Sequence, residues 1–143
     1  MRLGGVDVPH TAHAVGHSDA DALLHAITDA LLGAAALGDI GEMFPNDDPA
    51  NRARDSAEML RLAADRVEQH GWRIENVDCI VFAERPKLSA HKEVIRGRIA
   101  GILGLWPEQV GVKAKTGEGV DAVGREEAVM AQCVALLVAR DAG

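Results

Sequence analysis

The stretch His17-Ser18-Asp19-Ala20-Asp21-Ala22-Leu23-Leu24-His25-Ala26-Ile27-Thr28-Asp29 predicts the first helix of the protein. Ser18 is expected to be its N-cap, because Asp21 follows three residues later at the spacing of a capping box. We expect this helix to run to about Leu37, since Gly38 supplies a stop signal.

The same stretch carries two candidates for chemistry. Asp21, His25 and Asp29 are four residues apart, so they share a helix face on which an imidazole lies between two carboxylates. His25 could be a zinc ligand, because Zn²⁺ binds imidazole nitrogen and a neighbouring carboxylate would fix the tautomer of the ring. The alternative is a structural role, since a histidine in a helix is often a core residue with its hydrogen bonds satisfied. His17 precedes the helix N-terminus, where N–H groups favour an anion, so it is either a phosphate contact or a solvated loop histidine.

Two further helices are predicted downstream. Asp55-Ser56-Ala57-Glu58 is a second capping box, and its helix is expected to end near His70-Gly71. The apolar stripe of that helix is formed by Leu60, Ala63, Ala64 and Val67. Residues 89–103 also have helical periodicity, and Gly104 ends them. The apolar positions of this last helix are Val94, Ile95, Ile99 and Leu103.

Strands are predicted in the second half of the chain. Residues 77–83 read as a strand buried on most of both faces, which Pro86 ends. Residues 110–115 alternate apolar and polar like a half-exposed strand. Residues 128–138 are apolar and fit either a helix or a strand, although their alternation would suit a strand.

Composition limits the class of protein. The chain has 143 residues, which is one domain large enough for an ordinary core, and no linker marks a second domain. Its net charge of −7 argues against a general nucleic-acid binder. Cys79 and Cys133 lie in apolar segments and are expected to be buried thiols, which suits a reducing cytoplasm. No apolar run approaches membrane-spanning length, and residues 1–5 lack the apolar core of a signal peptide, so we expect a soluble protein that is not exported.

Two polar loops complete the candidate chemistry. Asp39 and Asn46-Asp47-Asp48 offer oxygen acceptors for sugar hydroxyls or a hard cation, but an ordinary polar turn looks the same. Residues 113–119, followed by Gly124-Arg125, bring together two ammonium groups, a hydroxyl, a guanidinium and glycine N–H groups. These groups are complementary to a diphosphate, and Glu118 could hold a bridging divalent ion. A glycine-rich turn with solvated charges is the alternative.

The ordered blocks resemble the 2-C-methyl-D-erythritol 2,4-cyclodiphosphate synthase family of non-mevalonate isoprenoid biosynthesis, from Leu3 to Val138. The matching blocks are His17-Ser18-Asp19-Ala20-Asp21, residues 25–34, Gly38-Asp39-Ile40-Gly41, Phe44-Pro45, Asp55-Ser56, Asn76-Val77-Asp78, Arg85-Pro86-Lys87, residues 112–118 and Gly124-Arg125-Glu126-Glu127. The resemblance implies an α+β domain with a mixed four-stranded sheet, helices on one face, and a strand at residues 128–138. It also implies a homotrimer that packs through its sheets, with active sites between subunits.

The resemblance implies a phosphorus–oxygen lyase that cyclises 4-diphosphocytidyl-2-C-methyl-D-erythritol 2-phosphate and releases CMP. His25 matches a zinc ligand, Glu118 a ligand of a second divalent ion (Mg²⁺ or Mn²⁺), and His17 and Thr116 the residues that stabilise the transition state. The implied substrate contacts are His17, Ser18, Asp39, Ile40, Gly41, Phe44, Pro45, Asn46, Asp47, Asp48, Ala83, Glu84, Arg85, Pro86, Lys87, Leu88, Ser89, Lys115, Thr116, Gly117, Glu118, Ala122 and Arg125. The pathway cytidylyltransferase is an implied partner, by association or fusion.

Two further zinc ligands come, in this family, from an Asp-x-His pair on a first short strand, and this sequence starts after that strand. Asp7 and His10 are one residue further apart, which puts their side chains on opposite faces of a strand. We therefore expect either a shortened chain, nearly inactive as it stands, or a catalytically impaired relative that binds CDP or isoprenoid diphosphates without turnover. A purely structural trimer is the third reading.

Overall fold

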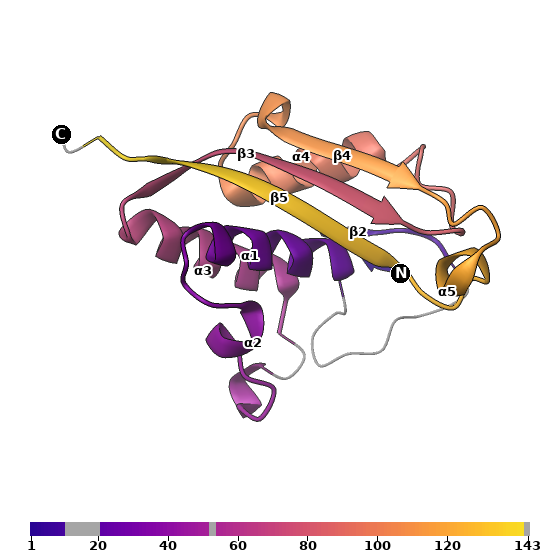
Figure 1. Cartoon of the computed structure of the whole chain (residues 1–143), viewed down its shortest axis with the longest axis horizontal. Helices are drawn as coiled ribbons and strands as arrows, with labels where there is room; N and C mark the ends of the chain where they lie inside the picture. The colour runs from indigo at the N-terminus through magenta and orange to yellow at the C-terminus, as the bar shows by residue number, and fades with distance from the viewer. Residues whose placement is uncertain (11–20, 52–53, 142–143) are drawn as a thin grey trace.

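The structure is a computed structural model that describes residues 1–10, 21–51 and 54–141 (Figure 1). The elements, in chain order, are β1 (Arg2–Leu3), β2 (Val6–Asp7), α1 (Ala22–Ala34), α2 (Ile40–Met43), the 3₁₀ turn η1 (Pro49–Asn51), α3 (Ser56–Gln69), β3 (Trp72–Phe82), α4 (Lys92–Leu103), the 3₁₀ turn η2 (Pro107–Gln109), β4 (Val110–Lys115), α5 (Asp121–Gly124) and β5 (Met130–Ala139). The α+β class is confirmed, and so is a strand rather than a helix at the C-terminal apolar segment.

The main sheet is mixed and has three strands in the order β4-β3-β5. β3 pairs in parallel with β4, from Val77 opposite Val110 to Phe82 opposite Lys115, and antiparallel with β5. The four-stranded sheet that we expected is not seen in residues 1–10, 21–51 and 54–141. The two additional strands, β1 and β2, form a separate antiparallel hairpin that the sequence analysis did not foresee.

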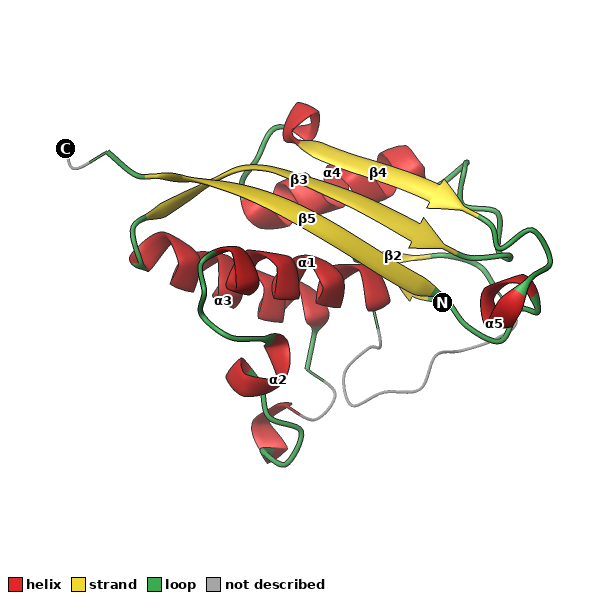
Figure 2. Ribbon diagram, viewed as in Figure 1, coloured by secondary structure: helices red, strands yellow, loops and turns green. Residues whose placement is uncertain are grey.

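The helices cover one face of this sheet, as expected (Figure 2). α1 packs against β5, α4 packs against β4, and α3 packs against both α1 and β3. The stripe predicted for α3 is buried, with Leu60, Ala63, Ala64 and Val67 all at 0% exposure. On α4, Ile95, Ile99 and Leu103 are buried as predicted, whereas Val94 is exposed and Ile102, which was not predicted, is buried as well.

The other face of the sheet is open in a single chain. Val77, Cys79 and Val81 of β3 face the helices and are buried, whereas Ile80 and Phe82 on the opposite face are only half-buried. The prediction that this strand is buried on most of both faces is therefore wrong for one chain. The open face continues onto β5 with Met130, Val134 and Leu136, which are 51%, 74% and 54% exposed.

The first helix begins and ends differently from the prediction. Its N-cap is Asp21, whose carboxylate accepts a hydrogen bond from Leu24 N at 3.0 Å, and Ser18 lies outside the described residues. The helix ends at Ala34 rather than Leu37, because Ala36 is left-handed (φ 57°) and the N–H of Leu37 turns back to a carbonyl within the helix.

The two cysteines are free thiols, as predicted. Cys79 and Cys133 lie opposite each other on β3 and β5, with their Sγ atoms 3.6 Å apart. The hydrogen bond to Cys133 and the burial of Cys79 raise the pKa of the Cys79 thiol far above its ordinary range. Throughout the described ranges, no helix has the length and apolar character that crossing a bilayer requires.

Candidate functional site

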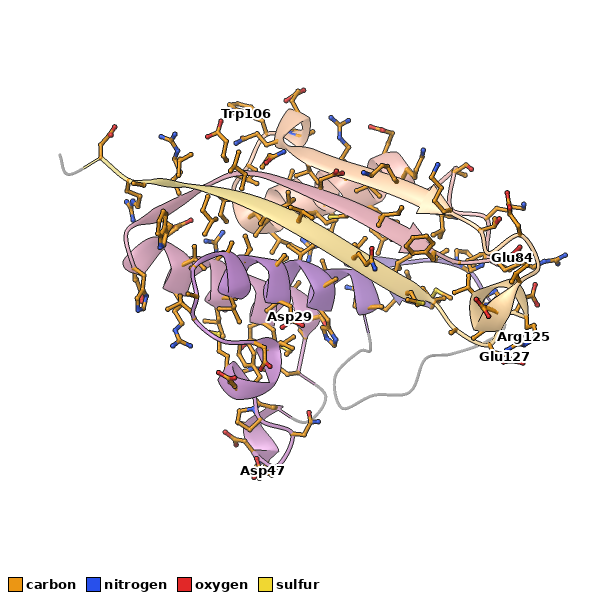
Figure 3. The ribbon with its side chains drawn as sticks, in the orientation of Figure 1. Asp29, Asp47, Glu84, Trp106, Arg125 and Glu127 are labelled. Carbon is orange, nitrogen blue, oxygen red and sulfur yellow. The ribbon has the colours of Figure 1, made fainter. Side chains whose placement is uncertain are left out.

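The first part of the candidate site lies where β3 and β4 end. Because these strands are parallel and Phe82 pairs with Lys115, the loops that follow them leave the sheet at the same edge. Ala83 N donates to the Lys115 carbonyl at 2.9 Å, which extends the pairing into the loops. Figure 3 shows Glu84, Arg125 and Glu127 gathered at this end of the sheet, beside α5.

A tightly packed glycine turn follows β4. A Cβ atom on Gly117 would lie 2.6 Å from Gly124 N, and one on Gly124 would collide with the backbone of Gly119. The turn therefore needs glycine at these positions, because backbone packs directly on backbone. Glu118 within it is left-handed, with φ 52°. The glycines that the sequence analysis interpreted as flexible donors are thus closely packed.

The loop after β3 is joined to this turn by side chains. Glu84 Oε1 accepts hydrogen bonds from Gly117 N and Gly119 N, at 3.2 and 3.3 Å. Arg85 Nε lies 2.9 Å from Glu126 Oε1. Glu84 is one of the predicted substrate contacts, but its bond to the turn could not be predicted, since nothing in the sequence shows that two segments 33 residues apart meet.

The charged and hydroxyl groups of this region face outward. Lys115, Thr116 and Glu118 are exposed, and the Thr116 hydroxyl oxygen accepts a bond from Glu118 N at 3.2 Å. Because that bond uses an oxygen lone pair, the Thr116 O–H can still donate to a ligand. Arg125 is paired with Glu127 through Nε at 3.1 Å, an exposed contact that a phosphate could replace at small cost.

The remaining predicted residues of this region differ in exposure. Ala83 and Leu88 are buried. The half-buried or exposed residues are Arg85, Pro86, Lys87, Ser89 and Ala122. A ligand at the edge of β3 and β4 would therefore meet an ordered rim of polar side chains around two loops of fixed backbone.

The second part of the candidate site lies on α1 and the segment that projects below it. His25 is half-buried, and its Nε2 lies 2.7 Å from Ser56 Oγ at the start of α3. Both carboxylates expected to flank His25 are used in backbone hydrogen bonds. Asp29 accepts from Ile40 N at 2.7 Å, and Asp21 accepts from three backbone N–H groups. Ser56 is a contact of His25 that the sequence analysis missed.

The projecting segment, residues 39–51 and 54–55, has contacts of its own besides the bond from Ile40 N to Asp29 of α1. Asp39 is the N-cap of α2 and accepts from Glu42 N at 2.8 Å. Phe44 is buried, with the guanidinium of Arg54 5.3 Å from its ring centroid. Arg54 also donates to Asn51 Oδ1, at 2.9 Å. This packing presents the exposed predicted contacts Gly41, Pro45, Asn46, Asp47 and Asp48, with Ile40 half-buried beside them.

The described residues of the two parts lie apart within one chain. Figure 3 shows Asp47 at the tip of the projecting segment, well away from Glu84 and Arg125 at the end of the sheet. His17 and Ser18, expected to contact phosphate, lie outside the described residues. Within the described ranges, no three side chains of His, Cys, Asp or Glu come close enough together to hold a metal ion. A complete zinc ligand set is therefore not formed by these residues.

The sequence model of the YgbB family matches residues 1–138. The chain belongs to the YgbB family. A similar relative is the 2-C-methyl-D-erythritol 2,4-cyclodiphosphate synthase of Rhodopirellula baltica, 52% identical over 140 residues, which cover 98% of this chain and 84% of the relative. This YgbB chain is accordingly an enzyme, a cyclodiphosphate synthase of the lyase class, as the sequence analysis predicted.

Solved structures agree with this membership of the YgbB family. The bifunctional IspDF from Campylobacter jejuni superposes with a TM-score of 0.94 at 38% identity, over 99% of this chain and 38% of that longer chain. The IspF of Plasmodium falciparum in its CDP complex has a TM-score of 0.86 at 33% identity, over 99% of this chain and 85% of that one. The fold is thus shared along essentially the whole length of this YgbB chain.

Proposed function

We propose that this protein converts 4-diphosphocytidyl-2-C-methyl-D-erythritol 2-phosphate into 2-C-methyl-D-erythritol 2,4-cyclodiphosphate with release of CMP. The observation that carries the proposal is the family match over residues 1–138. The ordered polar rim at the ends of β3 and β4 supports it. A related structure holds CDP, which shares the cytidine diphosphate portion of the proposed substrate.

The chemistry requires positioning more than proton transfer. The 2-phosphate oxygen of the substrate is already an anion, so it can attack the β-phosphorus without a base, and CMP leaves with the bonding electron pair. The protein must hold two anionic groups together and disperse the charge that develops on phosphorus. Positioned donors and cations are suited to that task, and no redox cofactor is needed.

The residues are assigned by the chemistry they offer. Thr116 and Lys115, at the end of β4, would donate to the diphosphate, and Arg125 would exchange its bond with Glu127 for a phosphate oxygen. The loop of residues 83–89 would hold the cytidine, and residues 39–48 the erythritol unit. His17 and Ser18 would contact phosphate; they remain predictions from the sequence, outside the described part of the chain.

Metal dependence is part of the proposal. His25 would supply one zinc ligand, with the others coming from outside the described residues, and Glu118 would hold a second divalent ion. Such ions supply positive charge next to the phosphate oxygens. The exposed carboxylate of Glu118, within the turn after β4, is a suitable oxygen donor for Mg²⁺ or Mn²⁺.

A homotrimer would join the two parts of the site. The open sheet face carries Ile80, Phe82, Met130, Val134 and Leu136, an apolar surface that a second copy of the chain could cover. Packing through this face would allow the projecting segment of one subunit to approach the loops of its neighbour. The bifunctional neighbour structure supports the expected association with the pathway cytidylyltransferase. The free thiols suit the cytoplasm.

CMP release from the diphosphocytidyl substrate tests the function directly. We expect release that depends on Mg²⁺ or Mn²⁺ and is abolished by a chelator. The assay should compare this chain with one extended by the family's Asp-x-His strand, because the proposed zinc set needs ligands besides His25. CDP binding without release in both forms would favour the impaired-relative reading. Absence of both binding and release would refute the proposed function.

A further inference from the structure

We propose that Glu84 is a positioning residue, which holds the turn after β4 in the shape that presents Thr116 and Glu118 to the substrate. The inference rests on the function proposed above, because it concerns how the diphosphate end of that site is built. It assigns Glu84 a role within the protein instead of a contact with the nucleoside, which is what the sequence analysis expected of its segment.

The geometry of the Glu84 carboxylate carries the inference. Its Oε1 atom accepts from Gly117 N at 3.2 Å and from Gly119 N at 3.3 Å, so a single oxygen binds the backbone on both sides of Glu118. An sp² oxygen has two lone pairs, so it can accept both bonds at once. These two bonds therefore define the path of the backbone through Glu118.

The turn needs such a partner because its backbone is strained. Glu118 and Gly119 are both left-handed, with φ of 52° and 75°, and this region is unfavourable for a residue with a side chain, such as Glu118. The turn has a backbone bond of its own, from Val120 N to Gly117 O at 2.9 Å, and Glu84 adds the acceptor for the two N–H groups on either side of Glu118. The bonds to Glu84 offset the cost and select one conformation among many.

These hydrogen bonds also determine which donors and acceptors of the turn can still bind a ligand. The N–H groups of Gly117 and Gly119 point to Glu84, and that of Glu118 points to the Thr116 oxygen. The donors and acceptors that face outward are then side chains, above all the Thr116 hydroxyl and the Glu118 carboxylate. Removing Glu84 would release the backbone and misplace both side chains together.

Glu84 also couples two loops that would bind adjacent parts of the substrate, the cytidine and the diphosphate. It belongs to the loop after β3, whose first residue, Ala83, is bonded to Lys115 at 2.9 Å. The other contact between these loops, Arg85 with Glu126, is exposed and contributes little to stability. Half-buried Glu84 is therefore the main side-chain connection between the loop assigned to cytidine and the turn assigned to diphosphate.

Three variants at this position test the inference. Glu84→Gln keeps an oxygen that can accept both bonds, Glu84→Asp keeps the charge but shortens the reach, and Glu84→Ala removes the acceptor. The matched control is Glu108→Ala, which removes an exposed glutamate from η2, away from the site. We expect Glu84→Ala and Glu84→Asp to lower kcat for CMP release roughly 10- to 100-fold, with little change in KM or in the Kd for CMP.

Glu84→Gln and Glu108→Ala should stay close to wild type. A rescue by glutamine and not by aspartate shows that the position of the acceptor, and not the negative charge, is what matters. If Glu84→Ala weakens CMP binding as much as it lowers kcat, Glu84 contacts the nucleoside and the inference is wrong. If Glu84→Ala binds CDP more tightly, the glycine N–H groups are phosphate donors that Glu84 blocks, which also overturns it.

A readout that does not need activity separates this inference from the proposed function. Amide proton exchange at Gly117 and Gly119, followed by NMR, should accelerate in Glu84→Ala and Glu84→Asp but not in Glu84→Gln or Glu108→Ala. Unchanged exchange in Glu84→Ala would refute the positioning role even if kcat fell. A chain extended by the Asp-x-His strand that neither binds CDP nor releases CMP would refute the proposed function, whereas the exchange experiment would still decide whether Glu84 holds the turn.

Discussion

Asp21 Oδ2 accepts a hydrogen bond from Gly5 N at 2.8 Å, although the two residues are 16 apart in the sequence. The other carboxylate oxygen of Asp21 accepts from Gly4 N at 2.9 Å and from Leu24 N at 3.0 Å. One fully buried side chain thus caps α1 and fastens the turn of the β1–β2 hairpin to it. The carboxylate that the sequence suggested as a partner of His25 has a structural role in this protein.

Replacing Asp21 should therefore destabilise the fold strongly. Asp21→Ala leaves three buried N–H groups without the carboxylate, and we expect a loss of about 2–4 kcal/mol in the free energy of unfolding. Urea denaturation at fixed protein concentration measures it. The matched control is Asp7→Ala, since Asp7 is 87% exposed and pairs only at the surface with Arg2. A loss below about 1 kcal/mol in Asp21→Ala would show that water or a neighbour replaces the carboxylate.

Zinc binding should depend on His25. We expect His25→Ala to lose bound zinc while keeping its fold, as measured by atomic absorption and circular dichroism on the chain extended by the Asp-x-His strand. Ser56→Ala should lower zinc affinity less, because Ser56 orients the imidazole without binding the metal. His70→Ala, an exposed change at the end of α3, is the control. Equal zinc content in His25→Ala and wild type would remove His25 from the site.

Assembly should depend on the open face of the sheet. Val134→Glu places a charge in the centre of that face, where Val134 is 74% exposed in one chain, and we expect it to shift sedimentation from trimer to monomer. Val94→Glu makes the same change on α4, on the helix side of the sheet, and should leave assembly unaffected. A wild-type chain that sediments as a monomer at micromolar concentration would contradict the trimer itself.

Substitutions of Thr116 and of Arg125 should change different kinetic constants when they are made in the chain extended by the Asp-x-His strand. Thr116→Val removes a donor proposed to act in the transition state, so kcat should fall roughly 10²–10³-fold with little change in KM. Arg125→Ala should mainly raise KM, because its guanidinium is proposed to grip phosphate in the ground state. Steady-state CMP release provides both constants. A Thr116→Val enzyme with normal kcat would exclude the hydroxyl from charge stabilisation.

The sequence by itself was sufficient to predict the helices and strands whose sequence patterns depend only on neighbouring residues. The alternation of residues 110–115 and the capping residues of α3 predicted elements that the structure confirms, because such patterns act within a few residues of the backbone. The same holds for the apolar stripe of α3. The ordered motifs also sufficed to identify the family, since the comparisons match them over residues 1–138.

Tertiary structure alone decided what depends on contacts between distant segments. The periodicity of α4 could not show that Val94 faces solvent, because a helix's apolar stripe does not reveal which edge its neighbours leave uncovered. The bonds of Asp21 to Gly4 and Gly5, the contact of His25 with Ser56 and the bridge from Glu84 to Gly117 each join residues 16 or more apart. These groups come together only when the chain folds, and local propensity does not predict such contacts. The sequence shows which chemical groups are present, whereas the packing of α1 against the sheet determines which of them interact.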